Sequence, residues 1–319
     1  MKIHAPFALA AVSLAVMSVS CSSKEGMIPL AGNTQASAGE GEALYREAKA
    51  ADDTGKRSKA IKLYAQVADK HPTAPSAAMA RYRQAELLEQ DGDIVKSFEA
   101  YQEFLQRYQG SGLYSKALGK QAQMAQAAAD GKVKSGFAGL KFLGIKGGLS
   151  TEKAIEMLGQ VRDNAPQSET AAKAQFTIGE LYQSEQDTRK SKQAIEAYRK
   201  LVRDQPRSKY AAEALFRVGV VLLEDADRGN RNQATLNLAD EAFRDYLMQY
   251  PGHAKNAEAR RLMASLKGKE LDRSMEIAEF YDKSGQTESA KIYYRAVLKN
   301  SSSGAAHNKA KARLKELGE

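Results

Sequence analysis

The sequence predicts an all-α protein in which pairs of helices stack into a solenoid. Two observations support this fold class. One pattern of small, bulky and proline residues returns four times along the chain at helical spacing. A second apolar pattern carries glycine or alanine at one fixed position in three further segments. Units of this kind bury a continuous core only by stacking on one another.

The first 20 residues predict a signal peptide. Lys2 supplies a positive start, and the 15 residues 5–19 are largely apolar. This stretch is shorter than the roughly 20 residues that a transmembrane helix needs. Cys21, the single cysteine of the chain, follows at once and cannot form a disulfide within it.

The residues around Cys21 resemble the lipobox of bacterial lipoproteins, in the form Ser18-Val19-Ser20-Cys21. Val19 and Ser20 fit that pattern, whereas Ser18 stands where an aliphatic residue is usual. The resemblance implies that Cys21 is lipidated and becomes the mature N-terminus. It also implies the outer membrane as destination, because no aspartate follows the cysteine. Ordinary secretion and an uncleaved segment are the alternatives.

Residues 21–41 are expected to form a flexible tether. They are rich in serine, glycine and alanine and contain too little apolar surface to bury. Such a tether would hold the body of the protein, expected over residues 42–319, away from a membrane surface.

The main repeat begins after residue 42. A small residue precedes a bulky one by four positions and a proline by twelve. Residues four apart share a helix face, so the small residue permits close approach beside the bulky one. The proline then ends the helix. The segments are Ala60-Tyr64-Pro72, Ala154-Leu158-Pro166, Ala194-Tyr198-Pro206 and Ala239-Phe243-Pro251, and Ser97-Tyr101 and Ala290-Tyr294 keep the first half.

A second pattern precedes these segments, with a small residue at one fixed position: Gly179, Gly219 and Ala278. Glycine inside a helix costs about 1 kcal/mol relative to alanine. Its return at one position therefore predicts close contact between helices there. The segments are FTIGELY (176–182), FRVGVVL (216–222) and MEIAEFY (275–281).

This arrangement resembles the tetratricopeptide repeat, in which two antiparallel helices form a unit and the units stack into a right-handed superhelical solenoid. The resemblance implies about six helix pairs and a capping helix over 305–317. One long helix is expected over 253–284, which contains no proline and no strong break. The six units are expected near 42–75, 76–112, 113–167, 168–207, 208–252 and 253–303.

Residues 130–149 form a glycine-rich insertion in the third unit. Its six glycines break any long helix, yet it also carries large apolar residues. A self-packing loop and a contact with a partner or membrane are the two interpretations. A nucleotide-phosphate loop is excluded, because Ile145 follows Gly144 where that motif needs lysine and then serine or threonine.

No set of convergent reactive groups is present in the sequence. His4 lies in the leader, and His71, His253 and His307 are expected at turns between units or in the last helix. We therefore expect a non-enzymatic protein with no catalytic residue, metal site, cofactor or small-molecule substrate. The net charge of +9 arises from 48 basic and 39 acidic residues that are interleaved. This pattern predicts a solvated helical surface and not nucleic-acid binding.

The C-terminal part resembles the BamD/ComL-like outer-membrane assembly lipoproteins. In that family a repeat with an insertion leads into a long helix, an Ala-Glu-aromatic-Tyr stretch and a turn glycine. The stretch FRDYLMQYPGHAKNAEAR, then Ala278-Glu279-Phe280-Tyr281 and Gly285, match this order. The chain departs from the family by one additional repeat and a last pair reduced to one helix.

The resemblance implies an accessory lipoprotein of the barrel-assembly machinery at the periplasmic face of the outer membrane. It would bind the barrel-forming subunit through its C-terminal repeats and unfolded outer-membrane proteins through its N-terminal repeats. The alternative is a different tetratricopeptide-repeat adaptor of the cell envelope, associated with cell division or peptidoglycan.

Four residues are candidates for a peptide groove. Tyr45 and Tyr82 occupy the same position in the first two units, close to Lys49 and Arg83. Aromatic and basic groups together would suit the aromatic C-terminus and carboxylate of an unfolded barrel protein. Packing between helices is the alternative role for both tyrosines.

Overall fold

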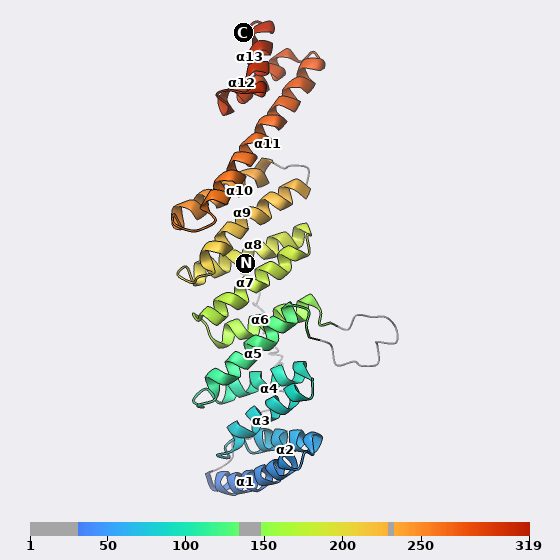
Figure 1. Cartoon of the computed structure of the whole chain (residues 1–319), viewed down its shortest axis with the longest axis vertical. Coiled ribbons are helices and arrows are strands. Elements are labelled where there is room, and N and C mark those ends of the chain that lie inside the picture. The colour runs from blue at the N-terminus through green and yellow to red at the C-terminus, as the bar shows by residue number, and fades with distance from the viewer. Residues whose placement is uncertain (1–30, 134–147, 229–232) are drawn as a thin grey trace, which may run out of the picture.

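The structure is a computed structural model that describes residues 31–133, 148–228 and 233–319. Helices joined by turns and short loops make up these residues, and consecutive helices stack along one long axis (Figure 1). The first helix lies at one end of the stack and the last helix at the other. The helices are α1 (Ala31–Asp53), α2 (Arg57–Lys70), α3 (Ala77–Gln90), α4 (Ile94–Arg107), α5 (Tyr114–Ala129), α6 (Thr151–Asn164), α7 (Glu169–Ser184), α8 (Thr188–Asp204), α9 (Ala211–Arg228), α10 (Gln233–Gln249), α11 (Asn256–Lys283), α12 (Thr287–Asn300) and α13 (Ala305–Glu316).

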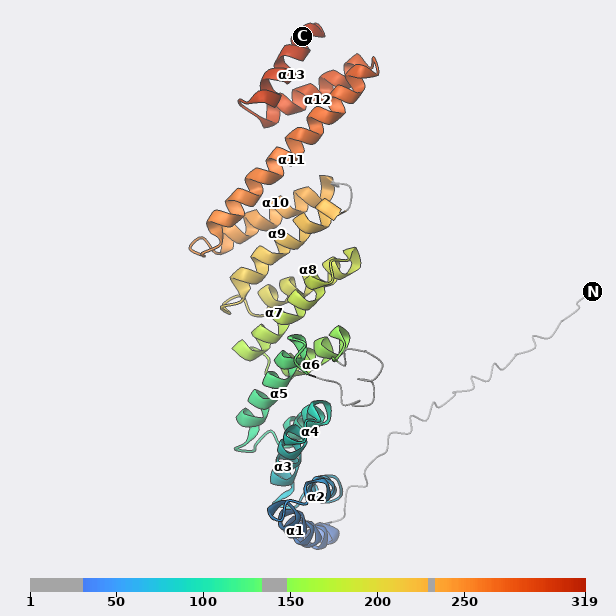
Figure 2. The ribbon, with the colours of Figure 1, turned by 45° about the vertical axis from the view of Figure 1, so that its right-hand side comes forward.

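The helices pair in sequence order as antiparallel hairpins, α1 with α2 through α11 with α12, and α13 follows as a single helix (Figure 2). This confirms the predicted all-α solenoid of tetratricopeptide type. Helix α11 has 28 residues and lies within the predicted long segment. Two of the hydrophobic clusters meet along it, because its first half packs on α9 and α10 and its second half on α12 and α13.

Helix α1 starts at Ala31, eleven residues before the expected start of the body at residue 42, so the second half of the expected tether 21–41 is helical. Small side chains allow this helix to dock. A Cβ atom at Gly41 would lie 2.7 Å from the Cβ atoms of His71 and Ala74. Glu42 accepts a hydrogen bond of 2.8 Å from the backbone N–H of Ser76. Close backbone approach and this polar contact hold the segment, and neither leaves an apolar pattern in the sequence.

One aromatic contact recurs inside four hairpins and fixes the register of the paired helices. The ring centroids of Tyr45 and Tyr64 are 5.7 Å apart, and those of Tyr82 and Tyr101 are 5.5 Å apart. Phenylalanine takes the first position in the later units. There the pairs are Phe176–Tyr198 at 5.5 Å and Phe216–Phe243 at 5.7 Å.

The two helix-interior glycines of the second pattern lie against these rings. A Cβ atom at Gly179 would approach the Tyr198 ring to 2.5 Å, and one at Gly219 would approach the Phe243 ring to 2.6 Å. Real Cβ atoms do not come this close to a ring. The absence of a side chain therefore sets the distance between α7 and α8 and between α9 and α10, as the pattern predicts.

An amide cluster joins α4, α5 and α6 across the insertion. The Nδ2 group of Asn164 donates to Gln121 Oε1 at 2.8 Å and to Gln102 Oε1 at 2.6 Å. The hydroxyl of Tyr114 donates to the carbonyl of Asn164 at 3.0 Å. Because Gln121 is fully buried, these bonds satisfy polar groups that would otherwise be costly to bury. They fix α5 beside α6.

Two expectations lie outside the described residues. The signal peptide and Cys21 precede residue 31, and most of the glycine-rich insertion falls within 134–147. Among the helices that the structure describes, none combines the length and the apolar character that crossing a membrane requires.

Candidate functional site

The four sequence-predicted groove residues lie on α1 and α3, and all four have structural partners. Tyr45 and Tyr82 make the recurring hairpin contact, in the position where Phe176 and Phe216 stand in later units. Tyr82 is only 7% exposed. A position that accepts phenylalanine does not depend on a hydroxyl group, so packing explains both tyrosines.

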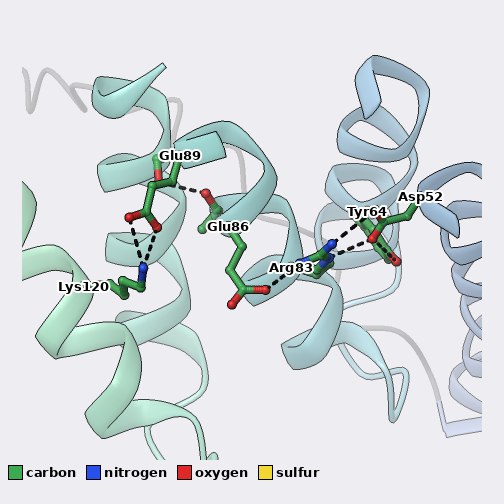
Figure 3. Close-up of polar contacts among 8 residues, drawn as sticks. Asp52, Tyr64, Arg83, Glu86, Glu89 and Lys120 are labelled. Carbon is green, nitrogen blue, oxygen red and sulfur yellow. Dashed lines mark hydrogen bonds and ion pairs between the residues drawn. The ribbon is translucent and has the colours of Figure 1, made fainter. Parts of the chain in front are cut away.

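Arg83 connects the first two units instead of pointing at open solvent (Figure 3). Its Nε atom lies 2.7 Å from Asp52 Oδ2 on α1, and its Nη1 atom lies 3.0 Å from Glu86 Oε2. The hydroxyl of Tyr64 on α2 also reaches Asp52, at 3.4 Å. The Arg83 guanidinium holds the pKa of the Asp52 carboxyl below its usual range. Lys49 pairs with Asp53, one turn away, at 2.9 Å.

The same connection occurs at the other end of the solenoid. Arg313 on α13 donates to Asp282 on α11 with Nη2 at 3.0 Å, and the hydroxyl of Tyr294 on α12 lies 3.1 Å from Asp282. The spacing repeats too: 31 residues separate aspartate and arginine, and 12 separate aspartate and tyrosine, in both places. Helix α13 therefore stands where the first helix of a further unit would stand.

A third ion pair continues this series to α5. Lys120 donates to both carboxylate oxygens of Glu89 at 3.0 Å, which joins α3 to α5 (Figure 3). Side-chain pairs thus close the seam between the first helices of successive units in the N-terminal half. The repeated spacing of aspartate and arginine was the sequence signal that could have assigned Arg83 to this seam.

Beyond these pairs, a hollow of about 560 Å³ opens between α5 and α7. We call it the α5–α7 hollow. Its floor is apolar and its rim is charged, a composition common in ligand-binding sites. The floor consists of Ala122, Ala127, Leu158, Val161, Ala174 and Tyr210, and the rim includes Asp130, Lys132, Glu169, Lys173 and Lys209.

Two lysines on this rim have no acidic partner among the residues that the structure describes. Lys132 pairs with Asp130 at 2.7 Å, and Glu169 accepts a hydrogen bond from Ser208 at 3.1 Å. Lys173 and Lys209 form no ion pair with any carboxylate in the described part of the chain. The Lys209 ammonium lies 5.2 Å from the centroid of the Tyr210 ring. The rim therefore offers two cations beside an apolar floor.

A second hollow of about 520 Å³ lies between the C-terminal halves of α7 and α9. We call it the α7–α9 hollow. Its lining is mostly charged or polar and includes Glu180, Gln183, Arg217, Glu224, Asp227 and Arg228. Asp227 pairs with Lys269 at 2.6 Å, whereas Glu224 accepts only an amide hydrogen bond from Gln183, at 3.2 Å, among the residues described.

Glu180 is the least compensated acid of this hollow. Its side chain reaches solvent, but no ion pair to it forms within the described ranges. The helices around it shield its carboxyl from water, and this desolvation raises its pKa, against the opposing charge of Arg217. An added cation beside Glu180 would stabilise the ionised form.

The two hollows lie along the same side of α7, because Glu169, Lys173, Glu180 and Gln183 follow one another at intervals of three, four or seven residues. We call this surface the α5–α7–α9 face. It is lined by Gln123 and Gln126 of α5, Lys173 and Glu180 of α7, and Arg217 and Glu224 of α9. The lining of the α5–α7 hollow has three basic and two acidic side chains, and that of the α7–α9 hollow has three acidic and two basic ones.

The described residues show no group of acids, histidines or cysteines that could hold a metal ion. The histidines among the described residues form hydrogen bonds with hydroxyl groups of neighbouring side chains. The Nδ1 atom of His253 lies 2.7 Å from the hydroxyl of Tyr246, and that of His307 lies 3.2 Å from the hydroxyl of Ser301. His71 makes a similar contact with Ser37, at 3.1 Å.

Comparison with protein families identifies the family of the chain. The family model described as YfiO, outer membrane lipoprotein, matches residues 148–317, and a tetratricopeptide-repeat model matches residues 45–112. The chain belongs to the YfiO family of outer membrane lipoproteins. The YfiO match begins just before α6 and extends into α13. The α5–α7 hollow therefore combines the first helices of the matched region with α5, which precedes it.

Membership in the YfiO family supports association with the outer membrane and a role as a tetratricopeptide-repeat scaffold for protein partners. Proteins of both matched families are typically interaction scaffolds without catalytic activity. No curated protein matches the chain.

Several solved structures are similar to the chain, at low identity. The MamA protein is 18% identical, with 69% of this chain and 96% of that chain covered, at a TM-score of 0.30. The C-terminal part of a repeat-containing protein from Cytophaga hutchinsonii is 12% identical, with 85% and 87% covered, at 0.34. A repeat protein from Parabacteroides merdae is 14% identical, with 88% and 99% covered, at 0.29. All three TM-scores are below 0.5.

Proposed function

We propose that this YfiO-family protein is a lipid-anchored scaffold of the outer-membrane β-barrel assembly machinery. It receives unfolded outer-membrane proteins on the α5–α7–α9 face and binds the barrel-forming subunit through its C-terminal helices. The observation that carries the proposal is the open, charged-rimmed α5–α7 hollow on a scaffold of an outer membrane lipoprotein family.

An unfolded chain suits the α5–α7–α9 face for physical reasons. It presents apolar side chains, charged termini and backbone groups in an extended form, and repeat solenoids bind such segments along a lined surface. The α5–α7 hollow supplies apolar contact at Ala122 and Ala174, and cations at Lys173 and Lys209 that form no ion pair within the described ranges. Because both lysines are exposed, they are available to a ligand.

The C-terminal helices support the second contact. Phe280 on α11 is 64% exposed and lies against Tyr281, at 5.6 Å between ring centroids. Tyr281 in turn stacks on Tyr293 of α12 at 5.7 Å. Aromatic side chains that reach the surface are enriched in protein interfaces, where their burial contributes much of the binding energy. We propose that this aromatic group of α11 and α12 contacts the barrel-forming subunit.

Cys21 supplies the anchor in this proposal. Ten residues lead from Cys21 to Ala31, where helix α1 begins. Even fully extended, a segment of this length reaches at most about 36 Å. The N-terminal unit would therefore remain close to the inner surface of the outer membrane, and the rest of the solenoid would extend along the periplasmic side.

Cross-linking in living cells tests the substrate role. A photoreactive residue in place of Gln123, on the α5–α7–α9 face, is expected to cross-link newly made outer-membrane barrel proteins. The same substitution at Gln193, an exposed glutamine on α8, is the matched control and is expected to give none. Equal yields at both positions, or no barrel protein at Gln123, would contradict the proposed role of this face.

A further inference from the structure

We propose that the first half of α11 binds an acidic helix of a partner protein, in the place where a second helix stands in the other units. The surface consists of exposed residues that share one side of α11, and we call it the open face of α11. Its residues are Ala257, Arg260, Arg261, Ala264, Lys267 and Gly268. The inference goes beyond the proposed function, because Phe280 and its aromatic neighbours take no part in it.

The first step is that α11 belongs to two units. Gly179, Gly219 and Ala264 each stand thirteen residues after the preceding proline. The two glycines lie against a ring of the second helix of their hairpins, whereas Ala264 is exposed. Ala278, further along α11, is fully buried in the cluster that α11 forms with α12 and α13. Helix α11 therefore begins a hairpin at Asn256 whose second helix the described residues do not supply.

The second step identifies the side of α11 that this leaves open. Ala264 and Ala278 are 14 residues apart, so they lie on the same side of the helix. Helices α12 and α13 cover this side in the second half of α11, and α9 and α10 cover the opposite side in the first half (Figure 2). Helix α12 ends at Asn300, where Lys299 and Asn300 line a hollow of about 360 Å³ together with Lys267. From this hollow to the start of α11, none of the described helices covers this side.

The third step concerns the charge of the open face. Phe216 and Leu222 of α9 are buried, and the positions equivalent to them in α11 are occupied by Arg261 and Lys267. Both of these side chains and that of Arg260 are exposed, and they form no ion pair within the described ranges. The open face thus carries three cations and no carboxylate, where α9 carries apolar side chains that pack on its second helix.

The chemistry of the partner follows from this arrangement. Arg260 and Lys267 are seven residues apart, about 10 Å along the helix axis, so they can pair with two carboxylates at the same interval on a neighbouring helix. The small side chain of Ala264 between them lets that helix approach closely. A face that meets only water is expected to carry both signs of charge, as the terminal helix α13 does at Lys315 and Glu316. The occupant is an amphipathic helix whose apolar stripe is bordered by glutamate or aspartate.

Helical peptides and the purified full chain test this partner chemistry. The first peptide is a fluorescent helix of about three heptads, with leucine and alanine on one side and glutamate at every seventh position along both edges of that side. The second peptide has lysine in place of each glutamate, and the third has proline at its centre. Anisotropy titrations are expected to show about tenfold weaker binding of the second and third peptides, because one meets like charges and the other cannot remain a continuous helix.

Charge reversal on the protein tests whether the open face makes this choice. A chain with both Arg260→Glu and Lys267→Glu is expected to prefer the lysine peptide over the glutamate peptide. The matched control carries Lys192→Glu and Arg199→Glu, which replace two exposed cations that are also seven residues apart, on α8. This control should keep the original preference. All four side chains are exposed, so folding should be unaffected, and thermal unfolding checks this.

Cross-linking locates the bound peptide. A photoreactive residue in place of Ala264 is expected to cross-link the glutamate peptide, whereas the same residue in place of Ala43, an exposed alanine of α1, is expected not to. Equal cross-linking from both positions would contradict binding at the open face.

The remaining outcomes would overturn the proposal in distinct ways. Failure of the glutamate peptide to bind, or a preference for it that survives Arg260→Glu with Lys267→Glu, would exclude an acidic helix at the open face. A dimer of this chain that the same two substitutions dissociate, measured by light scattering, would assign the face to a second copy instead. None of these results depends on cross-linking from Gln123 in cells, so the proposed function is tested separately.

Discussion

Replacing Gly179 with valine is expected to unfold the central units of the solenoid. Even the Cβ atom of alanine would lie 2.5 Å from the Tyr198 ring. That ring is fully buried and its hydroxyl donates to Gln183 at 3.0 Å, so it cannot move aside without losing packing and a hydrogen bond. Overpacking of this kind costs about 1–3 kcal/mol for small additions, and the branched valine adds further contacts.

The loss should extend beyond one hairpin, because each unit of a solenoid is stabilised by its neighbours. Thermal unfolding followed by circular dichroism measures the effect, and hydrogen exchange shows where protection is lost. Gly179→Ala should lower the midpoint, and Gly179→Val should lower it more. The expected loss of protection is centred on α7 and α8.

Gly268→Ala is the matched control, since Gly268 also lies inside a helix, α11, but has nothing within 4 Å of the added Cβ atom. This variant should gain up to about 1 kcal/mol from helix propensity. If Gly179→Ala were as well tolerated as Gly268→Ala, the close contact between α7 and α8 would not exist as described.

Replacing Cys21 with serine is expected to move the protein from the membrane fraction to the soluble fraction. Serine offers no thiol for lipid attachment, and among the described helices none could span the membrane in its place. Stable anchoring by acyl chains needs more than one chain, so loss of the modified residue should be decisive. Fractionation of cells, with a high-salt wash to screen residual charge attraction, measures the release.

Ser18→Leu provides the complementary variant for the anchor. It places an aliphatic residue where lipoproteins usually carry one, and it should leave the protein in the membrane fraction. Mass spectrometry of the N-terminal peptide identifies the modification directly. An unmodified Cys21 in the N-terminal peptide of the wild-type protein would refute the anchor, whatever the result for Ser18→Leu.

The hairpins could be predicted from sequence because their causes are periodic. Ala194, Tyr198 and Pro206 lie on one helix face and at its end, and the same chemistry returns in the other units. The start of α1 could not be predicted in this way. It docks through Gly41 against His71 and Ala74. Such a contact depends on the absence of a side chain and leaves no apolar period.

The candidate site was harder to predict, because local composition does not show which units meet. Tyr82 and Arg83 looked like a site, since aromatic and basic residues stand together there. Comparison across the units gives each residue a structural role instead. Phenylalanine stands in the position of Tyr82 at residues 176 and 216 of the later units. The 31-residue spacing between Asp52 and Arg83 returns between Asp282 and Arg313. These are signs of packing.

The α5–α7 hollow depends on long-range assembly. Ala122 comes from α5, Lys173 from α7, and Lys209 from the turn before α9. No single repeat contains all three, and none of them follows a motif. Their proximity arises from the stacking of successive units, with α5 held beside α6 by the amide cluster at Gln121.

Purification of the tagged protein from outer membranes in a mild detergent tests the central claim most directly. The account predicts that a large barrel protein with periplasmic repeat domains is recovered with the tagged protein at a constant ratio, and that the same procedure does not recover it from an untagged strain. Reproducible absence of that protein, with proteins of cell division or peptidoglycan recovered in its place, would contradict the account and favour the alternative adaptor role.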